Sequence, residues 1–146
     1  MGPVYRFATS WRLAAPADTV YDALKDVDAY VRWWPQVRRV SRIDDDCGSV
    51  SIRSLLPYTL ELVLRREVED PGTGELRVAV RGDLHGWSAW HLGQGDDGTT
   101  VASYRQEVEL RAPVLRQVSF AARPLLRANH TVMMRDGERG LRAHLA

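Results

Sequence analysis

The sequence is poor in the residues that mark several classes of protein. Its single cysteine, Cys47, excludes an intrachain disulfide and cannot by itself build a zinc site. No stretch approaches the roughly 18 apolar residues that span a bilayer, and the first residues lack the apolar core of a signal peptide. Charge of one sign is not in excess, since 20 Lys and Arg face 19 Asp and Glu. We therefore expect a cytoplasmic protein with no stable membrane insertion and no nucleic-acid partner.

Motifs of the common enzyme classes are missing as well. No serine or cysteine stands in a nucleophile elbow, and no glycine-rich stretch matches a phosphate-binding loop. The acidic runs at residues 44–46 and 96–97 fall in turn-like segments, where aspartate bonds to its own backbone. His85 and His91 are six residues apart, whereas metal sites on strands normally use neighbours at i and i+2. We predict no metal and no cofactor.

What the sequence does contain is the composition of one folded domain. Its 146 residues are 45% hydrophobic and 27% charged, which is typical of a globular chain. No internal repeat or linker-like run divides it, so we expect a single domain over residues 1–146. The sequence leaves a monomer and a homodimer equally open.

The first third of the chain predicts a strand followed by two short helices. Over residues 5–13, Tyr5, Phe7, Trp11 and Leu13 alternate with polar residues, which is the period of a half-buried strand. Asp18 is the expected cap of a helix that continues to Val27. We predict a second helix over residues 28–34, capped by Asp28 and ended by Pro35.

Residues 37–110 predict an antiparallel meander of six strands. Turn signals fall at residues 44–48, around Pro57, and at 70–74 and 95–98. Between them, apolar residues alternate so that one face of the sheet is covered. Val101 lies out of phase with its strand, and this predicts a bulge near Ser103. The residues expected on the covered face are Tyr58, Leu60, Leu62, Leu64, Leu76, Val78, Val80, Tyr104, Gln106, Val108 and Leu110.

After Pro113, about thirty residues predict helix, with Pro124 placed to begin a longer second segment. At 100° per residue, an apolar stripe runs through Leu125, Asn129, Val132, Met133 and Gly137, flanked by Leu126, His130 and Leu141. A curved sheet of about seven antiparallel strands around a long C-terminal helix is an α+β architecture. Side chains seldom fill all the space between a curved sheet and a single helix, so we expect a cavity there.

This element order, with residues 15–24 (APADTVYDAL), the Trp33-Trp34-Pro35 segment and residues 129–141 (NHTVMMRDGERGL), resembles the polyketide cyclase/dehydrase group of the START-like (Bet v 1-like, SRPBCC) superfamily. The resemblance covers nearly the whole chain. It implies a helix-grip fold with a deep apolar cavity for a lipid, a polyketide or a similar hydrophobic molecule. It implies no single reaction, because relatives include cyclases, carriers, receptors and chaperone co-factors.

The predicted ligand-binding residues are those on the inner faces, together with tryptophans placed to line or gate a pocket. One of the adjacent pair Trp33 and Trp34 is expected in the core and the other at the gate. Trp90 is expected to line the cavity, and His91 to be exposed. The full set is Trp11, Trp33, Trp34, Tyr58, Leu60, Leu62, Val80, Trp90, Tyr104, Gln106, Asn129 and Met133.

The function is predicted as the binding of a hydrophobic small molecule, and two alternatives stay open. One is a polyketide cyclase/dehydrase-type enzyme in which His130 shuttles a proton and Tyr104, Gln106 or Asn129 orients a carbonyl. The other is an interaction module like the chaperone co-factors. His130 lies at the margin of the helical stripe without a predicted carboxylate partner, which favours a structural role. A ring that points into the cavity within reach of Tyr104 or Gln106 would favour the proton shuttle.

Overall fold

The computed structural model describes residues 4–53, 58–111 and 123–146. The elements are β1 (Val4–Leu13), α1 (Ala17–Lys25), η1 (Val27–Arg32), β2 (Val37–Arg42), β3 (Cys47–Ile52), β4 (Leu60–Asp70), β5 (Glu75–Gly82), β6 (Leu84–Gln94), η2 (Asp96–Gly98), β7 (Thr100–Leu110) and α3 (Arg123–Leu145). The predicted strand, two short helices, six further strands and long terminal helix are therefore confirmed.

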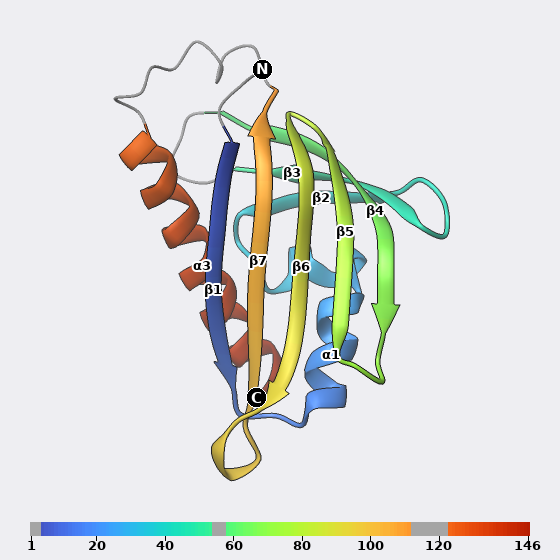
Figure 1. Cartoon of the computed structure of the whole chain (residues 1–146), viewed down its shortest axis with the longest axis vertical. Helices are drawn as coiled ribbons and strands as arrows, with labels where there is room; N and C mark the ends of the chain where they lie inside the picture. Colours follow the sequence, from blue (N-terminus) through green and yellow to red (C-terminus); the bar gives the residue numbers. More distant parts are fainter. Residues whose placement is uncertain (1–3, 54–57, 112–122) are drawn as a thin grey trace.

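The strands form one antiparallel sheet in the order β1-β7-β6-β5-β4-β3-β2. Because β1 pairs with β7, the first and last strands of the chain are neighbours at one edge of the sheet. Figure 1 shows the sheet curving so that β2 and β3 swing behind the other strands, with α3 running past the β1 edge. This is the expected helix-grip arrangement, in which the curved sheet and one helix enclose the interior.

The predicted bulge near Ser103 is wrong. Ser103 pairs with Ser10 on one side and His91 on the other, and both ladders run through it without a shift. Val101 simply lies half-buried on the outer face, where single apolar residues are common. The register shifts fall elsewhere, between Arg66 and Val68 of β4 and between Val37 and Arg39 of β2.

The short helices begin differently from the prediction. Pro16 occupies the N-cap of α1, and Asp18 lies inside the first turn, where its carboxylate accepts the Thr19 N–H. Asp18 still favours the helix, because a negative charge in the first turn interacts well with the helix dipole. The second helix, η1, is a 3-10 helix that contains Asp28 rather than being capped by it, and it ends before the two tryptophans that it was expected to include.

Helix α3 faces the sheet with a stripe rotated from the predicted one. Leu125, which was predicted to lie in the apolar stripe, is 52% exposed. The buried residues of this helix are Gly137, which was predicted in the stripe, Leu141, which was predicted on its flank, and Met134, which was not predicted. The predicted helical segment between Pro113 and Arg123 lies outside the described residues.

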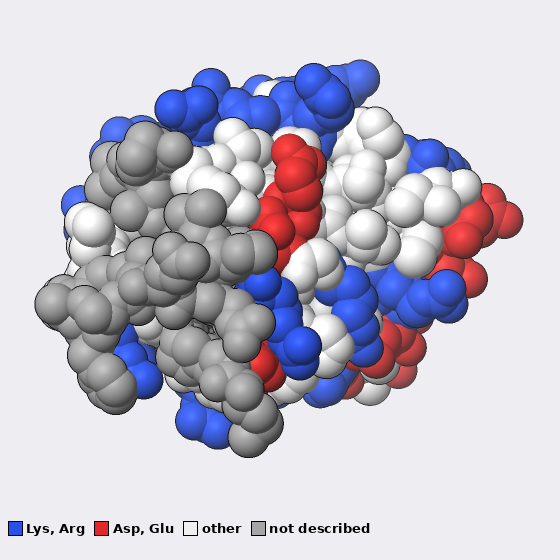
Figure 2. Space-filling model, turned by 90° about the horizontal axis from the view of Figure 1, so that it is seen from above, with Lys and Arg blue, Asp and Glu red and all other residues white. Residues whose placement is uncertain are grey.

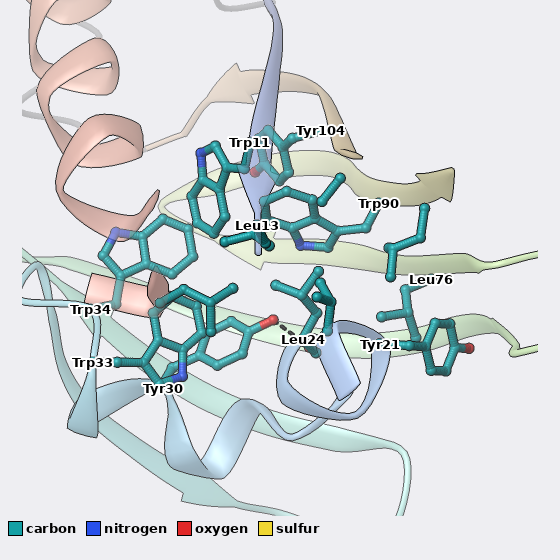
Figure 3. Packing of buried hydrophobic residues seen from close by; sticks show 14 of the residues in the cluster. Trp11, Leu13, Tyr21, Leu24, Tyr30, Trp33, Trp34, Leu76, Trp90 and Tyr104 are labelled. Carbon is teal, nitrogen blue, oxygen red and sulfur yellow. Dashed lines mark hydrogen bonds between the residues drawn. The ribbon is translucent and has the colours of Figure 1, made fainter. Parts of the chain in front are cut away.

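One end of the grip is filled by a cluster of aromatic side chains (Figure 3). The Trp11 ring lies 5.3 Å from that of Trp34 and 4.7 Å from that of Trp90, and Trp90 lies 4.7 Å from Tyr104. The hydroxyl of Tyr30 donates to the carbonyl of Leu24, which ties η1 to α1. Because rigid aromatic rings fill this end of the interior, any cavity must lie in the rest of the space between the sheet and α3.

The middle of α3 is anchored to this cluster, and its C-terminal half is anchored to the end of β1. Trp34 Nε1 donates to the Met133 carbonyl at 2.9 Å. The exposed backbone of Arg12 is satisfied by the helix, since its N–H donates to Glu138 Oε2 at 2.9 Å and its carbonyl accepts from Arg142 Nε at 2.9 Å. Side chains of the helix therefore satisfy the backbone groups that a neighbouring strand would otherwise bind at this end of β1.

Within the described part of the chain, no helix is both long and apolar enough to cross a membrane. Seen from above, basic and acidic side chains lie beside one another among uncharged ones, as the balanced composition predicts (Figure 2).

Candidate ligand cavity

A cavity of about 290 Å³ lies between the concave face of the sheet and α3. Its strand-borne walls are mainly apolar, with Leu62, Val80 and Val108 among the buried side chains and Met133 approaching from the helix. A space of this size and lining suits a small hydrophobic molecule.

The sheet register arranges the concave face in rows that cross several strands. Phe7, Gln106, Ser88 and Val78 form one such row, because Gln106 pairs with both Phe7 and Ser88, and Ser88 pairs with Val78. The next row contains Tyr104 and Trp90, which are also direct partners. Polar side chains from β6 and β7 are thereby brought together in the middle of an apolar wall.

These polar side chains form a hydrogen-bonded chain with His130 of α3. Tyr104 Oη donates to Ser88 Oγ at 3.1 Å, and Gln106 Nε2 donates to the same oxygen at 2.9 Å. His130 Nε2 lies 3.2 Å from Gln106 Oε1. Since an amide oxygen only accepts, the imidazole carries its proton on Nε2 in this contact. We call Ser88, Tyr104, Gln106 and His130 the polar cluster.

The surroundings of the polar cluster disfavour charge of either sign. Burial lowers the pKa of His130 to about 4, with a smaller contribution from the positive charge of Arg127. The ring of Phe7 stacks on the imidazole at 3.7 Å between centroids and shields one of its faces. Burial also raises the pKa of Tyr104 to about 12, against the opposing effect of its bond to Ser88. At neutral pH both groups are uncharged.

Most of the charged residues that line the cavity are exposed, which indicates that they lie toward its opening. They come from α1, η1, the β2–β3 hairpin, β4 and β5, and they include carboxylates that the sequence did not place on any inner face. Each lining cation has a partner: Lys25 with Asp22, Arg42 with Asp28, Arg66 with Asp46 and Glu69, and Arg77 with Glu67. Among the described residues, no group of three or more His, Cys, Asp or Glu side chains is arranged to hold a metal ion.

The structure places most of the predicted ligand-binding residues around this cavity. Those lining it are Trp34, Tyr58, Leu60, Leu62, Val80, Trp90, Tyr104, Gln106, Asn129 and Met133, and His130 lines it too. Trp11 and Trp33 do not line it. Both are at most 5% exposed and pack with other tryptophans at the filled end of the grip, so their predicted place at the cavity is wrong. Trp34 is equally buried and lines the cavity from within the core.

Ser88 of the polar cluster and Phe7, which stacks on His130, were not among the predicted site residues. Ser88 shares the inner face of β6 with Trp90, two residues away, and this spacing was the available signal. Phe7 alternates with Tyr5 on β1, but nothing in the sequence indicates that it stacks on His130. Contacts between β1 and the distant helix depend on how α3 crosses the sheet, which periodicity does not reveal.

Comparison with known proteins agrees with this fold. The family model described as "Polyketide cyclase / dehydrase and lipid transport" matches residues 13–131, and the chain belongs to this family. Among curated proteins, no match was found.

Solved structures with the same fold are distant in sequence. The Zhui aromatase/cyclase from Streptomyces sp. R1128 has a TM-score of 0.82 at 17% identity, covering 97% of this chain and 93% of that one. A START superfamily protein from Mycobacterium smegmatis has a TM-score of 0.73 at 13% identity, covering 95% of each chain. A protein from Thermus thermophilus, TTHA0849, has a TM-score of 0.73 at 16% identity, covering 99% of this chain and 100% of that one. At these identities, the likeness establishes the helix-grip fold.

Proposed function

We propose that this protein binds a hydrophobic small molecule, such as a lipid or a polyketide, in the cavity between the sheet and α3. The observation that carries the proposal is the 290 Å³ space with mainly apolar walls, in a chain whose family is described by cyclase, dehydrase and lipid-transport activities. Burial of a ligand's apolar surface there contributes about 25 cal/mol per Å². The cytoplasmic location and the choice between monomer and homodimer stay predictions.

Filling the cavity tests this proposal. Met133 lies half-buried at the cavity wall and contributes only its backbone carbonyl to the anchoring bond from Trp34. Met133→Trp therefore adds volume to the cavity while retaining that bond. We expect the variant to fold and to lose binding of an apolar fluorophore such as 1-aminoanthracene, measured by fluorescence titration.

The matched control places the same side chain on the solvent side of the helix. Ala128 is exposed, so Ala128→Trp is expected to bind the fluorophore like the unmodified protein. Equal binding by both variants would contradict the proposed site. A Met133→Trp protein that does not fold would identify Met133 as part of the packed core, and Leu62→Trp would then test the opposite wall.

A polyketide cyclase/dehydrase-type enzyme is the second candidate, and one contact favours it. His130 reaches the cavity within hydrogen-bond distance of Gln106, as a proton shuttle would require. Its depressed pKa keeps it neutral, and no carboxylate among its described partners orients the ring. His130→Gln separates the roles: loss of turnover with unchanged ligand affinity supports catalysis, whereas lower stability by roughly 1 to 3 kcal/mol with unchanged binding supports a structural role.

The chaperone co-factor-like alternative predicts an interior filled by side chains. The open cavity is the feature that favours small-molecule binding over it.

A further inference from the structure

The hydrogen bonds within the polar cluster leave one hydroxyl proton, that of Ser88, without an acceptor among the described residues. Ser88 Oγ accepts from both Tyr104 and Gln106, and these two bonds occupy the lone pairs of the hydroxyl oxygen. Its own proton has no acceptor among the described residues. The side chain is half-buried and lines the cavity, so a ligand in the cavity is an available acceptor for this proton.

The arrangement of the cluster holds this hydroxyl in place. Ser88 and Gln106 are direct cross-strand partners, and Tyr104 lies in the adjacent row of the concave face. Gln106 is itself oriented by His130, whose ring is stacked on Phe7. A donor fixed in this way loses little conformational freedom when it binds a ligand.

The charges that line the cavity disfavour an anionic ligand group as the matching acceptor; Arg127, whose charge acts on His130, stacks over Tyr5 and Phe7 and is not among the lining residues. Every Lys or Arg among the described lining residues is paired with a carboxylate. A carboxylate brought beside Ser88 would lose its hydration without gaining an unpaired cation, which is costly in an apolar wall. A ketone or similar oxygen requires far less desolvation.

We infer that the cavity selects a neutral hydrophobic molecule that presents a carbonyl-type oxygen to the Ser88 hydroxyl group. The inference rests on the proposed function, since it assumes that the cavity is the binding site, and it narrows the ligand from any hydrophobic molecule to uncharged carbonyl compounds. Fatty-acid anions and plain hydrocarbons are the classes that it disfavours.

Three naphthalene derivatives of similar size test the inference by equilibrium dialysis at neutral pH. 2-Acetylnaphthalene has a ketone, 2-ethylnaphthalene has no acceptor, and 2-naphthoate has an anionic carboxylate. In the unmodified protein, we expect the ketone to bind about tenfold or more tightly than the carboxylate. Ser88→Ala is expected to weaken ketone binding by about five- to tenfold and to change ethylnaphthalene binding by less than about twofold.

A serine on the other face of the sheet provides the control. Ser103 lies on the outer face of β7, beside Ser10, and Ser103→Ala is expected to leave binding of all three compounds unchanged. If Ser88→Ala does not fold, Ser88→Cys allows the same comparison, because a thiol is nearly the same size and is a weak donor.

The outcomes separate this inference from the proposed function. If Met133→Trp abolishes ethylnaphthalene binding, the cavity is retained as the binding site. If Ser88→Ala in the same experiments weakens binding of the ketone and of the hydrocarbon equally, or weakens neither, the inference about Ser88 is overturned. Tighter binding of naphthoate than of the ketone would overturn the preference for neutral ligands. Failure of all three compounds to bind would overturn both.

Discussion

The Cα of Gly140 lies so close to Trp33 that an added β-carbon would stand 1.7 Å from the Trp33 carbonyl oxygen. A backbone atom cannot move aside as the end of a flexible side chain can. Helix α3 is therefore able to approach the segment after η1 only because position 140 has no side chain.

This contact predicts that Gly140→Ala lowers the free energy of unfolding, by about 2 kcal/mol or more, although alanine is the better helix former. The measurement is urea unfolding followed by tryptophan fluorescence. Gly93→Ala is the control, because a β-carbon at Gly93 meets nothing within 4 Å and should change stability little. A Gly140→Ala protein as stable as the unmodified one would show that the helix can shift away from Trp33 without cost.

The low pKa of His130 predicts a loss of stability in mild acid. In the unfolded chain the imidazole titrates near 6.5, and in the folded protein near 4, so the unfolded state takes up the proton first as the pH falls. The free energy of unfolding therefore falls between about pH 6.5 and pH 4, by about 3 kcal/mol from this group, and is restored above pH 6.5. The difference in stability between the protein and His130→Gln, measured by urea unfolding across this range, isolates the effect.

The charged and polar neighbours of His130 do not oppose the predicted loss of stability in acid. Arg127 on the same helix acts in the same direction as burial, and Gln106 and Tyr104 from β7 are uncharged throughout the range. A pH-independent difference between the two proteins would mean that the folded imidazole titrates near its ordinary value.

Thr100 provides a prediction for the join between the sheet and α1. Its side chain is 1% exposed and donates to the Ala15 carbonyl at 2.7 Å, just before the helix begins. Thr100→Val keeps the shape and leaves that carbonyl unpaired, so we expect thermal and urea unfolding to report a loss of about 1 to 2 kcal/mol. Thr73→Val removes a similar bond, to the Asp70 carbonyl, at an exposed turn where water replaces it. Equal losses in the two variants would contradict the role of burial.

The strands and their faces could be predicted because alternation is a local property. Leu60, Leu62, Val80 and Tyr104 were placed on the inner face from a period of two, and they line the cavity. The bulge predicted from Val101 is wrong because the prediction also relied on alternation alone. A single apolar residue on the solvent-exposed face of a strand gives the same sequence pattern as a shift in strand register.

Which aromatic residues fill the core and which face a cavity could not be predicted, because that depends on how closely α3 approaches. A β-carbon at Gly137 would stand 2.6 Å from Trp34 and 2.8 Å from Trp11, so the missing side chain lets both rings pack directly on the helix. Trp11 consequently lies in the core. The hydrogen bonds that orient Ser88 come from two strands and depend on a helix crossing above them, and no sequence period encodes that convergence.

The helix contacts with Arg12 have a consequence for self-association. An open sheet, unlike a closed barrel, exposes the backbone of two outermost strands, and a second molecule can add to either of them. At the end of β1, Glu138 and Arg142 already occupy the backbone groups that an incoming strand would need. The opposite outermost strand, β2, presents exposed Arg38 and Arg39, whose like charges would meet those of an identical neighbour. The sheet can therefore remain open around α3 while both of its outermost strands disfavour pairing with a second molecule, the step by which fibrous assemblies grow.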